Sequence, residues 1–244
     1  MRRELYRVRR RNPSPQPQRQ VGAALRNFSN SRKVAVSSAA LTDALGRLSA
    51  HRAHVLDLVS PTPGRVLQGT AVTIRFIPFR QDVFTAQVNN FARFFYEAVP
   101  AHPEDTVLVM DSGGHPGTSV GGGTKFFRLQ NQKLAGLLTD GRLRDFGELE
   151  QYDPVFYCSG ETVKAGTADL MPVAANVPVV IGGVTVLPGD FVYADAAAAV
   201  IIPSTLVDET FRLAARIELE DAASLTSIRC EDPREIRISG AQEP

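Results

Sequence analysis

The sequence predicts an α/β fold in which a compact β-core is flanked by helices. Three patterns predict the strands of this core. Apolar and polar residues alternate through GTAVTIRFIP (69–78), as they do in a half-buried strand. Continuous apolar runs in DTVLVMD (105–111) and AGLLTD (135–140) are typical of buried strands. From residue 177 to 203, short apolar runs separated by Gly and Pro indicate a meander of further strands.

Four segments outside these runs have helical signals. Ser37 or Ser38 can cap a helix that continues through ALTDALGRL. Residues 82–98 space their apolar side chains as an amphipathic helix does, and residues 125–133 form a second expected helix after a Gly-rich loop. TLVD, which begins at Thr205, has the spacing of a capping box and predicts a helix that ends at about residue 223.

The charge distribution divides the chain into three parts. Residues 1–33 form a basic N-terminal extension with ten Arg or Lys against one Glu, a net +9, which leaves about −8 for the rest of a chain whose total is +1. We interpret residues 34–228 as one α/β domain and residues 229–244 as a polar C-terminal tail. A basic arm can bind nucleic acid, an anionic surface or an acidic partner. Because no aromatic residues alternate with its basic ones, we favour an arm that lies on the acidic body or on a neighbouring subunit, and nucleic-acid binding stays open.

The composition is that of a soluble globular protein without a membrane span. The chain has 244 residues, of which 43% are apolar and 22% are charged, and no window contains about 18 consecutive apolar residues. Cys158 and Cys230 lie far apart and match no metal-binding spacing. Two unpaired thiols are typical of a reducing compartment, so we expect a cytoplasmic protein.

The segment LLTDGRLRD (137–145) places charged residues directly after a buried strand. Asp140 ends the strand, and Arg144 stands next to Asp145. The planar guanidinium of Arg144 is suited to binding a carboxylate, and Asp145 is an oxygen ligand suited to Mg²⁺ or Mn²⁺. The alternative interpretation is an ion pair on the surface at a helix start, which would contribute about 0–1 kcal/mol.

A second segment that could form part of a binding site is the Gly-rich loop SGGHPGTSVGGG (112–123), which follows the other buried strand. The backbone N–H groups of Gly122, Gly123 and Thr124 precede a predicted helix, where the helix dipole attracts a carboxylate or a phosphate. Ordinary turn geometry is the alternative explanation for these glycines. Together the two segments predict an anion site beside a cation site.

An ordered series of motifs across residues 35–203 resembles one known family. LTDALG and GTAVTI are followed by TVLVMDSGG, AGLLTDGRLRD, PVF, VPVVIGGVTVLPGDFVYAD and VIIP. The series is similar to the RraA-like family, which contains the regulator of ribonuclease activity A and the 4-hydroxy-4-methyl-2-oxoglutarate/4-carboxy-4-hydroxy-2-oxoadipate aldolases. The resemblance implies a swivelling β/β/α fold and a homotrimer, sometimes doubled to a hexamer, with sites at subunit interfaces. For the aldolase members it also implies a divalent metal and the cleavage or decarboxylation of oxo acids through a pyruvate enolate.

The same resemblance implies roles for residues at matching positions. Arg144 matches the arginine that binds the carboxylate and carbonyl end of the substrate, and Asp145 matches the carboxylate that holds the metal. The backbone N–H groups of Thr124 and Lys125 match those that cradle the pyruvyl carboxylate. Asp140 matches an aspartate common among the aldolases, which favours an enzyme.

The sequence also departs from the aldolase pattern. Aldolase members carry Asp or Glu twenty-one residues before the arginine, and that position is Gly123 here. Because a carboxylate there takes part in proton transfer, its loss predicts altered acid/base chemistry. Lys125 and His115 are the candidate replacements as proton carriers, and an ordinary solvated side chain is the alternative for each. Arg142 replaces a small residue and, if it faces the pocket, favours a more anionic or phosphorylated substrate.

These observations predict a metal-assisted lyase of the aldolase or decarboxylase type that acts on a small 2-oxo acid or related carboxylate. In this hypothesis Arg144 and the loop N–H groups bind the anion, and Asp145 holds Mg²⁺ or Mn²⁺. The catalytic candidates are Arg144, Asp140, His115 and Lys125. The alternatives are a non-catalytic binding protein of the ribonuclease-regulator type, which the basic arm supports, and a metal-independent enzyme of specialised metabolism.

Overall fold

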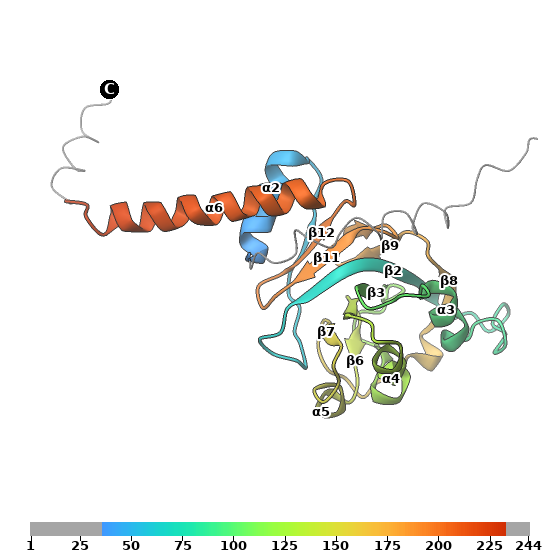
Figure 1. The fold of residues 1–244 in the computed structure, drawn as a ribbon. Coiled ribbons are helices and arrows are strands. Elements are labelled where there is room, and N and C mark those ends of the chain that lie inside the picture. The colour runs from blue at the N-terminus through green and yellow to red at the C-terminus, as the bar shows by residue number, and fades with distance from the viewer. Residues whose placement is uncertain (1–35, 233–244) are drawn as a thin grey trace, which may run out of the picture.

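A mixed β-sheet forms the centre of the protein (Figure 1). The computed structural model describes residues 36–232, and within them eight strands form this sheet in the order β1-β12-β11-β2-β3-β5-β7, with β8 attached to β2. The strands are β1 (His54–Val55), β2 (Leu67–Pro78), β3 (Thr106–Met110), β5 (Gly136–Thr139), β7 (Val155–Tyr157), β8 (Leu170–Ala175), β11 (Phe191–Ala194) and β12 (Ala199–Ile202). The structure confirms the predicted α/β class and the strands predicted from the three apolar runs at 69–78, 105–111 and 135–140.

The long strand β2 joins the two halves of the sheet. It runs parallel to β3, and β3, β5 and β7 are parallel to one another. Its other edge pairs with β11 at the start and with β8 toward the end, both antiparallel. Because β3 and β5 are parallel neighbours, the loops that follow them leave the same edge of the sheet. Loops at such an edge commonly carry the functional residues of α/β proteins.

Alternate residues of the central strands enter different apolar clusters, because successive strand residues face opposite sides. Leu108 and Met110 of β3 lie in the cluster formed with α3 (Phe91–Ala98), α4 (Gly123–Gln132) and α5 (Phe146–Leu149). Val107 and Val109 lie in the cluster formed with the hairpin of β9 (Val179–Ile181) and β10 (Val184–Val186). The predicted meander is therefore divided: β9 and β10 pair with each other, whereas β11 and β12 belong to the main sheet.

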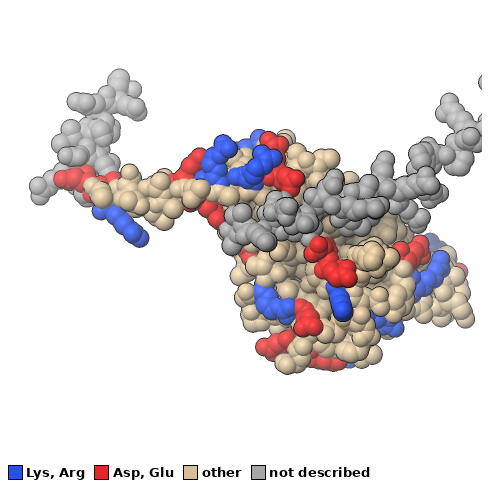
Figure 2. Space-filling view, viewed as in Figure 1, with Lys and Arg blue, Asp and Glu red and all other residues tan. Residues whose placement is uncertain are grey.

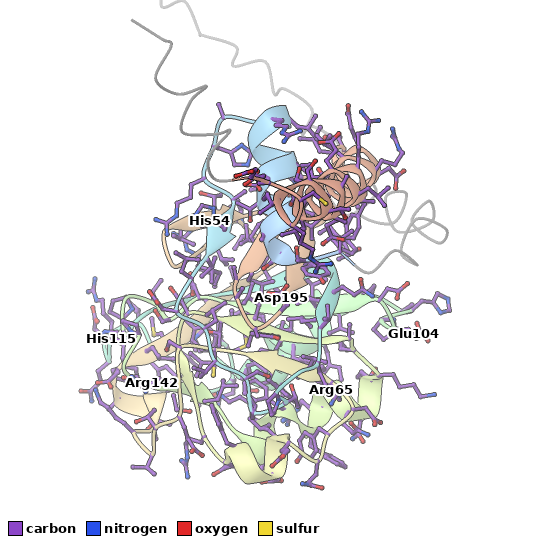
Figure 3. The ribbon with its side chains drawn as sticks, turned by 90° about the vertical axis from the view of Figure 1, so that its left-hand side faces the viewer. His54, Arg65, Glu104, His115, Arg142 and Asp195 are labelled. Atoms are coloured by element: carbon purple, nitrogen blue, oxygen red, sulfur yellow. The ribbon has the colours of Figure 1, made fainter. Side chains whose placement is uncertain are left out.

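A third apolar cluster joins α2 (Ser38–Leu48) and α6 (Val207–Ile228) to β11 and β12. The second half of α6 projects beyond the body (Figures 1 and 2), and its side chains Leu219, Leu225 and Ile228 are exposed. Figure 3 shows α2 and α6 together on one side of the sheet. Within residues 36–232, even the longest helix lacks the hydropathy that crossing a membrane requires.

The helix predicted at 82–98 is shorter than expected. It begins at Phe91, because Asn90 is its N-cap and accepts a hydrogen bond from the Ala92 N–H at 2.8 Å. The preceding residues form turns, in which the Asn89 side chain accepts the Thr85 N–H at 2.9 Å. Asn side chains that bind nearby backbone groups compete with helical hydrogen bonds, which apolar spacing does not reveal.

The C-terminal helix differs from its prediction at both ends. Its N-cap is Leu206, which makes no side-chain capping bond, so the predicted capping box at Thr205 is wrong. The chain makes a tight turn there, because the Leu206 N–H donates to the Pro203 carbonyl at 2.8 Å. The helix ends at Ile228 rather than at about residue 223.

Ser37 caps α2, in agreement with the prediction, and its hydroxyl accepts the Ala40 N–H at 3.2 Å. We expect Ser37→Ala to lower the free energy of unfolding by about 1 kcal/mol, because one N–H of the first turn loses its partner. Urea denaturation measures this change. Thr205→Ala is the matched control and should change the unfolding free energy little. A larger loss for Thr205→Ala than for Ser37→Ala would contradict the observed caps.

Candidate active site

A short parallel ribbon brings the Gly-rich loop and the LTDGRLRD segment together. It consists of β4 (Ser119–Gly121) and β6 (Arg142–Leu143). The Arg144 N–H donates to the Gly121 carbonyl at 2.9 Å, which holds the two chain segments in contact at the point where the ribbon ends. Beyond this bond one segment continues into the start of α4, and the other continues through Asp145 into α5.

The backbone of Asp145 directs its carboxylate toward the start of α4. Asp145 adopts the left-handed conformation, with φ 62° and ψ 45°, which is uncommon for a residue with a side chain. Its Oδ2 accepts the Gly123 N–H at 3.2 Å. A Cβ on Gly122 would overlap the same oxygen, so the close approach of the two segments requires glycine at position 122.

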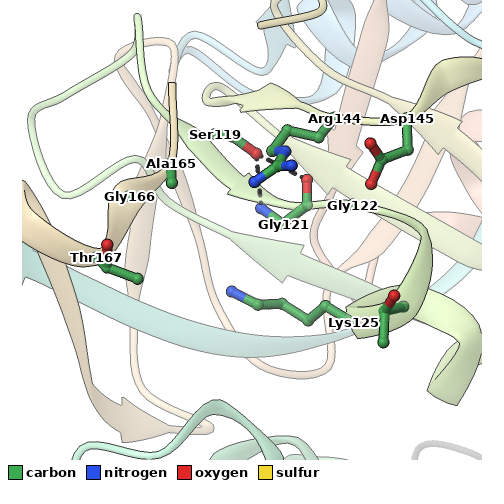
Figure 4. Close-up of a pocket in the computed structure, with 10 residues that line it drawn as sticks. Ser119, Gly121, Gly122, Lys125, Arg144, Asp145, Ala165, Gly166 and Thr167 are labelled. Carbon is green, nitrogen blue, oxygen red and sulfur yellow. Dashed lines mark hydrogen bonds between the residues drawn. The ribbon is translucent and has the colours of Figure 1, made fainter. Parts of the chain in front are cut away.

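Arg144 and Asp145 line one cavity of about 270 Å³ (Figure 4). The opposite wall carries Lys125, and the segment from Ala165 to Thr167 closes a third side. Among residues 36–232, no hydrogen bond or ion pair holds the Arg144 guanidinium, which leaves it available to an anion. The two adjacent charges therefore line one cavity and form no ion pair with each other.

The first turn of α4 contributes backbone donors to this cavity. The helix begins at Gly123, so the N–H groups of Thr124 and Lys125 belong to the first turn, where helical hydrogen bonds are not yet available. Gly122 and Thr124 both line the cavity. A carboxylate placed between these N–H groups and Arg144 would meet charge-assisted donors from two sides.

Lys125 reaches into the same cavity from α4. Its amine donates to the Val120 carbonyl at 2.6 Å and lies 4.8 Å from the centre of the Phe91 ring. Burial lowers the pKa of Lys125 to about 8, and the nearby Arg128 guanidinium lowers it further in the same direction. The amine is therefore far easier to deprotonate than that of a solvated lysine.

Sequence reasoning missed Glu148. A Cβ on Gly123 would overlap the Glu148 carboxylate. The Glu148 carboxylate therefore lies beside Gly123, the position at which aldolase members carry Asp or Glu. The Tyr152 hydroxyl donates to Glu148 Oε1 at 2.7 Å. Burial and this bond to Glu148 raise the pKa of Tyr152 to about 12, so the hydroxyl stays a donor. The only signal in the sequence is the helical spacing of Asp145, Glu148 and Tyr152, which is too common to be informative.

Asp140 and His115 lie outside this cavity. Asp140 lines a second cavity of about 460 Å³, where its oxygens accept the N–H groups of Ser112 at 2.8 Å and Gly182 at 3.2 Å. His115 belongs to the turn after β3, and Figure 3 shows it at the edge of the molecule. Within this chain, two of the four predicted catalytic residues are therefore not brought to Arg144.

Arg142 also lies outside the first cavity. Its guanidinium donates to the Glu161 carbonyl at 3.1 Å and packs against Gly160, where any Cβ would collide with it. Arg142 was expected to favour a more anionic substrate only if it faces the pocket. In this chain it does not face the pocket. Contacts with the segment at Gly160 and Glu161 hold the Arg142 guanidinium there, whereas Arg144 follows the ribbon and lines the cavity.

The second cavity gives a prediction about pH and stability. Asp111 lines it, and burial raises the pKa of Asp111 to about 6 from 3.8, with a further contribution from the Asp140 charge. Because the folded state holds the proton more tightly, stability should fall as pH rises from about 4 to 6. Asp111→Asn keeps an acceptor for the Phe76 N–H, which now donates to Asp111 Oδ1 at 2.6 Å, and removes this fall.

We expect Asp111→Asn to be more stable than the unchanged protein at pH 7, by on the order of 1–2 kcal/mol after allowance for partial solvent exposure. The difference should vanish near pH 4. Urea denaturation at a series of pH values measures it, and Asp43→Asn at an exposed position of α2 is the control. A stability difference that does not change with pH would contradict the assignment.

The donor set fits a small divalent cation. Asp145 and Glu148 place carboxylates against consecutive glycines at the start of α4. Mg²⁺ is commonly bound in proteins by one or two carboxylates and several waters. Among residues 36–232, no three His, Cys, Asp or Glu side chains are grouped so that they could hold a metal ion, so this chain supplies at most these two carboxylates here.

Comparison with known proteins identifies the family. The family model described as "RraA-like: Aldolase/RraA" matches residues 38–201, which is more than half of the chain. The chain belongs to the RraA-like family. The matched region contains the β4–β6 ribbon, both ends of α4 and the cavity between them.

Solved structures share the RraA-like fold. A Streptomyces coelicolor protein described as "RraAS2, an unusual member of the RNase ES inhibitor RraA protein family" is 30% identical, with a TM-score of 0.68, and the match covers 85% of this chain and 98% of that chain. An uncharacterised Pseudomonas syringae protein is 22% identical, with a TM-score of 0.65, and the match covers 89% of this chain and 96% of that chain.

Curated RraA-like relatives include proteins named as aldolases. A Halalkalibacterium halodurans protein named "Putative 4-hydroxy-4-methyl-2-oxoglutarate aldolase" is 27% identical over 132 residues, covering 52% of this chain and 59% of that protein. "Protein DlpA" of Legionella pneumophila is 26% identical over 192 residues, covering 79% of this chain but 30% of that protein. The chain thus spans less than two thirds of each of these two relatives. The relatives of this chain thus include a protein named as a putative aldolase and a protein described as a member of an RNase inhibitor family.

Proposed function

We propose that this RraA-like protein is a carbon–carbon lyase that cleaves or decarboxylates a small 2-oxo acid. The observation that supports it is the shared cavity in which Arg144, Asp145 and the first turn of α4 face one another. In a structural ion pair, Arg144 would bond to its neighbour. Instead its guanidinium is available beside backbone donors, as the recognition of a substrate carboxylate requires.

The reaction class follows from the distribution of charge. Arg144 and the N–H groups of Thr124 and Lys125 hold the carboxylate, which places the adjacent 2-oxo group near Asp145. A divalent cation held there, Mg²⁺ or Mn²⁺, would supply Lewis-acid polarisation of that oxo group. The bond that breaks joins carbon 3, next to the 2-oxo group, to the departing fragment. The electron pair that this bond leaves on carbon 3 is accepted by the 2-oxo group. Glu148, fixed by the Tyr152 hydroxyl, adds negative charge beside Asp145 and supports binding of the cation.

The direct test is an assay of the purified full-length protein with oxaloacetate and with aldol adducts of pyruvate, with and without Mg²⁺. We expect release of pyruvate, detected with lactate dehydrogenase, and a dependence on the cation. Absence of turnover with every 2-oxo acid that fits the cavity would contradict the proposal.

The proposed assembly is a homotrimer or a hexamer, in which a neighbouring subunit adds residues to the cavity. The cavity in the single chain is consistent with this because Arg144, Asp145 and Thr124 are exposed at its mouth. Light scattering after size-exclusion chromatography measures the mass. A monomer with full lyase activity would show that one chain is sufficient.

A second candidate function is a non-catalytic regulator that binds another protein. It is favoured by the description of the Streptomyces coelicolor relative as a member of an RNase inhibitor family. The basic extension of residues 1–33 lies outside the described residues. Deleting it distinguishes the two functions: a lyase should retain turnover, whereas a regulator that uses the arm should lose its partner in a pull-down.

A further inference from the structure

The amine of Lys125 is a buried positive charge with no carboxylate beside it. Among residues 36–232, its polar contact is the Val120 carbonyl, and its cationic end lies against the Phe91 ring. An unpaired buried ammonium is costly, and lysines that gain nothing from burial extend their amines into water. A lysine held inside a cavity without a counter-ion is therefore a candidate for chemistry.

The charges around this amine favour its neutral form. Arg128 lies on the same helix, and the Arg144 guanidinium lies across the cavity, with Asp145 beside it. From α3 the uncharged Phe91 ring faces the amine, and from β4 the Val120 carbonyl accepts its hydrogen bond. Burial and Arg128 bring the pKa of Lys125 down to about 8, so both protonation states are accessible near neutral pH. This is the condition under which a group both accepts and donates protons efficiently.

The position of the amine matches the place where a proton is needed. Arg144 and the first-turn N–H groups of α4 fix the carboxylate end of the ligand, and the flexible side chain of Lys125 starts from that same turn. Figure 4 shows its amine directed into the cavity from the side opposite Arg144. The bound 2-oxo acid would lie between the two groups, with its reacting carbon toward the amine.

We propose that Lys125 is the proton carrier of the lyase reaction, a role that rests on the proposed function. The neutral amine takes the proton from the hydroxyl group of an aldol substrate while the carbon–carbon bond breaks. The departing fragment leaves as a carbonyl compound, and the electron pair of the broken bond passes into the enolate of the 2-oxo acid. The ammonium then returns its proton to the carbon that lost the fragment, and the amine is neutral again. In a decarboxylation, carbon dioxide leaves instead, and water supplies the proton through the same amine.

The test follows the half-reaction that involves only proton transfer. A lyase that forms the enol of pyruvate exchanges the methyl hydrogens of pyruvate for deuterium in D₂O, which proton NMR measures. We expect Lys125→Met to slow this exchange about 100-fold or more, while the Kd for pyruvate from calorimetry changes only a few-fold. Lys125→Arg should also be slow, because a guanidinium does not release its proton near neutral pH. Lys133→Met, at an exposed position just after α4, is the matched control and should exchange like the unchanged protein.

A second variant separates the role of the amine from that of packing. Lys125→Cys should be inactive and should regain exchange after alkylation with 2-bromoethylamine, which rebuilds an amine of similar length. Exchange by Lys125→Met at the rate of the unchanged protein would overturn the inference. So would a pyruvyl adduct on Lys125 after borohydride reduction, because the amine would then act covalently. If the unchanged protein neither exchanges nor cleaves any 2-oxo acid, the proposed function itself fails.

Discussion

Arg144→Ala should lower kcat/KM for the 2-oxo acid roughly 10²–10³-fold, which is the cost typical of removing one donor that faces developing charge. The guanidinium has no structural partner among the described residues, so its removal should leave the free energy of unfolding nearly unchanged. Arg144→Lys should be intermediate, because an ammonium keeps the charge but loses the two-pronged geometry. Steady-state kinetics and urea denaturation on the same samples measure both effects.

Arg142→Ala provides the control for this experiment. Arg142 lies two residues before Arg144, in the strand that Arg144 follows, but its guanidinium donates to the Glu161 carbonyl outside the cavity. We expect kcat/KM to stay within a few-fold of the unchanged protein. If Arg142→Ala were as damaging as Arg144→Ala, the effect would come from the ribbon and not from the bound carboxylate.

Asp145→Asn should weaken the binding of Mn²⁺ by roughly 100-fold or more, because even residues that only support a metal ligand contribute about 10–100-fold to affinity. The substitution is well matched to the backbone. Asn tolerates the left-handed conformation observed at position 145, and its carbonyl oxygen can still accept the Gly123 N–H. The variant therefore removes the charge while the loop is retained. Isothermal titration calorimetry of Mn²⁺ into the full-length protein measures the change.

Glu148→Gln should weaken the same binding by a smaller factor, on the order of 10-fold, because Asp145 would remain in place. Glu150→Gln, at an exposed position directly after α5, is the control and should have no effect on the titration. Undiminished Mn²⁺ binding by Asp145→Asn would show that the cation site lies elsewhere.

The central strands were predictable because burial imposes a pattern on consecutive residues. In β3 and β5 every residue is buried and most are apolar, since both faces of these strands are covered, and such a run has few alternative structures. The helix at 82–98 was predicted too long because the side chains of Asn89 and Asn90 redirect the backbone, and a count of apolar positions does not register that effect.

The candidate site was predictable in part: the sequence already grouped Arg144 and Asp145 with the Gly-rich loop that leads to Thr124 and Lys125, and these residues line one cavity. Arg144 and Asp145 are adjacent and follow β6 directly, so the sequence motif itself shows that their side chains start from the same point of the chain. Glu148 was missed because its closeness to Gly123 depends on how α5 packs against α4, and no local pattern encodes it. Conversely, Asp140 ends a central strand as expected, but the turn after β5 holds it in the second cavity with Asp111.

The sequence alone thus determined the α/β class, the principal strands and the pair of charges at positions 144 and 145. Buried strands produce runs of apolar residues, and adjacent charges are visible directly in the sequence. Only the tertiary structure decided which groups share a cavity. It directed the Lys125 amine into the cavity of that pair, brought the Glu148 carboxylate against Gly123, and kept His115 and Asp140 out of the cavity. The reason is physical: contacts between distant segments depend on strand pairing and helix packing, which are set by the whole fold and not by any single stretch of residues.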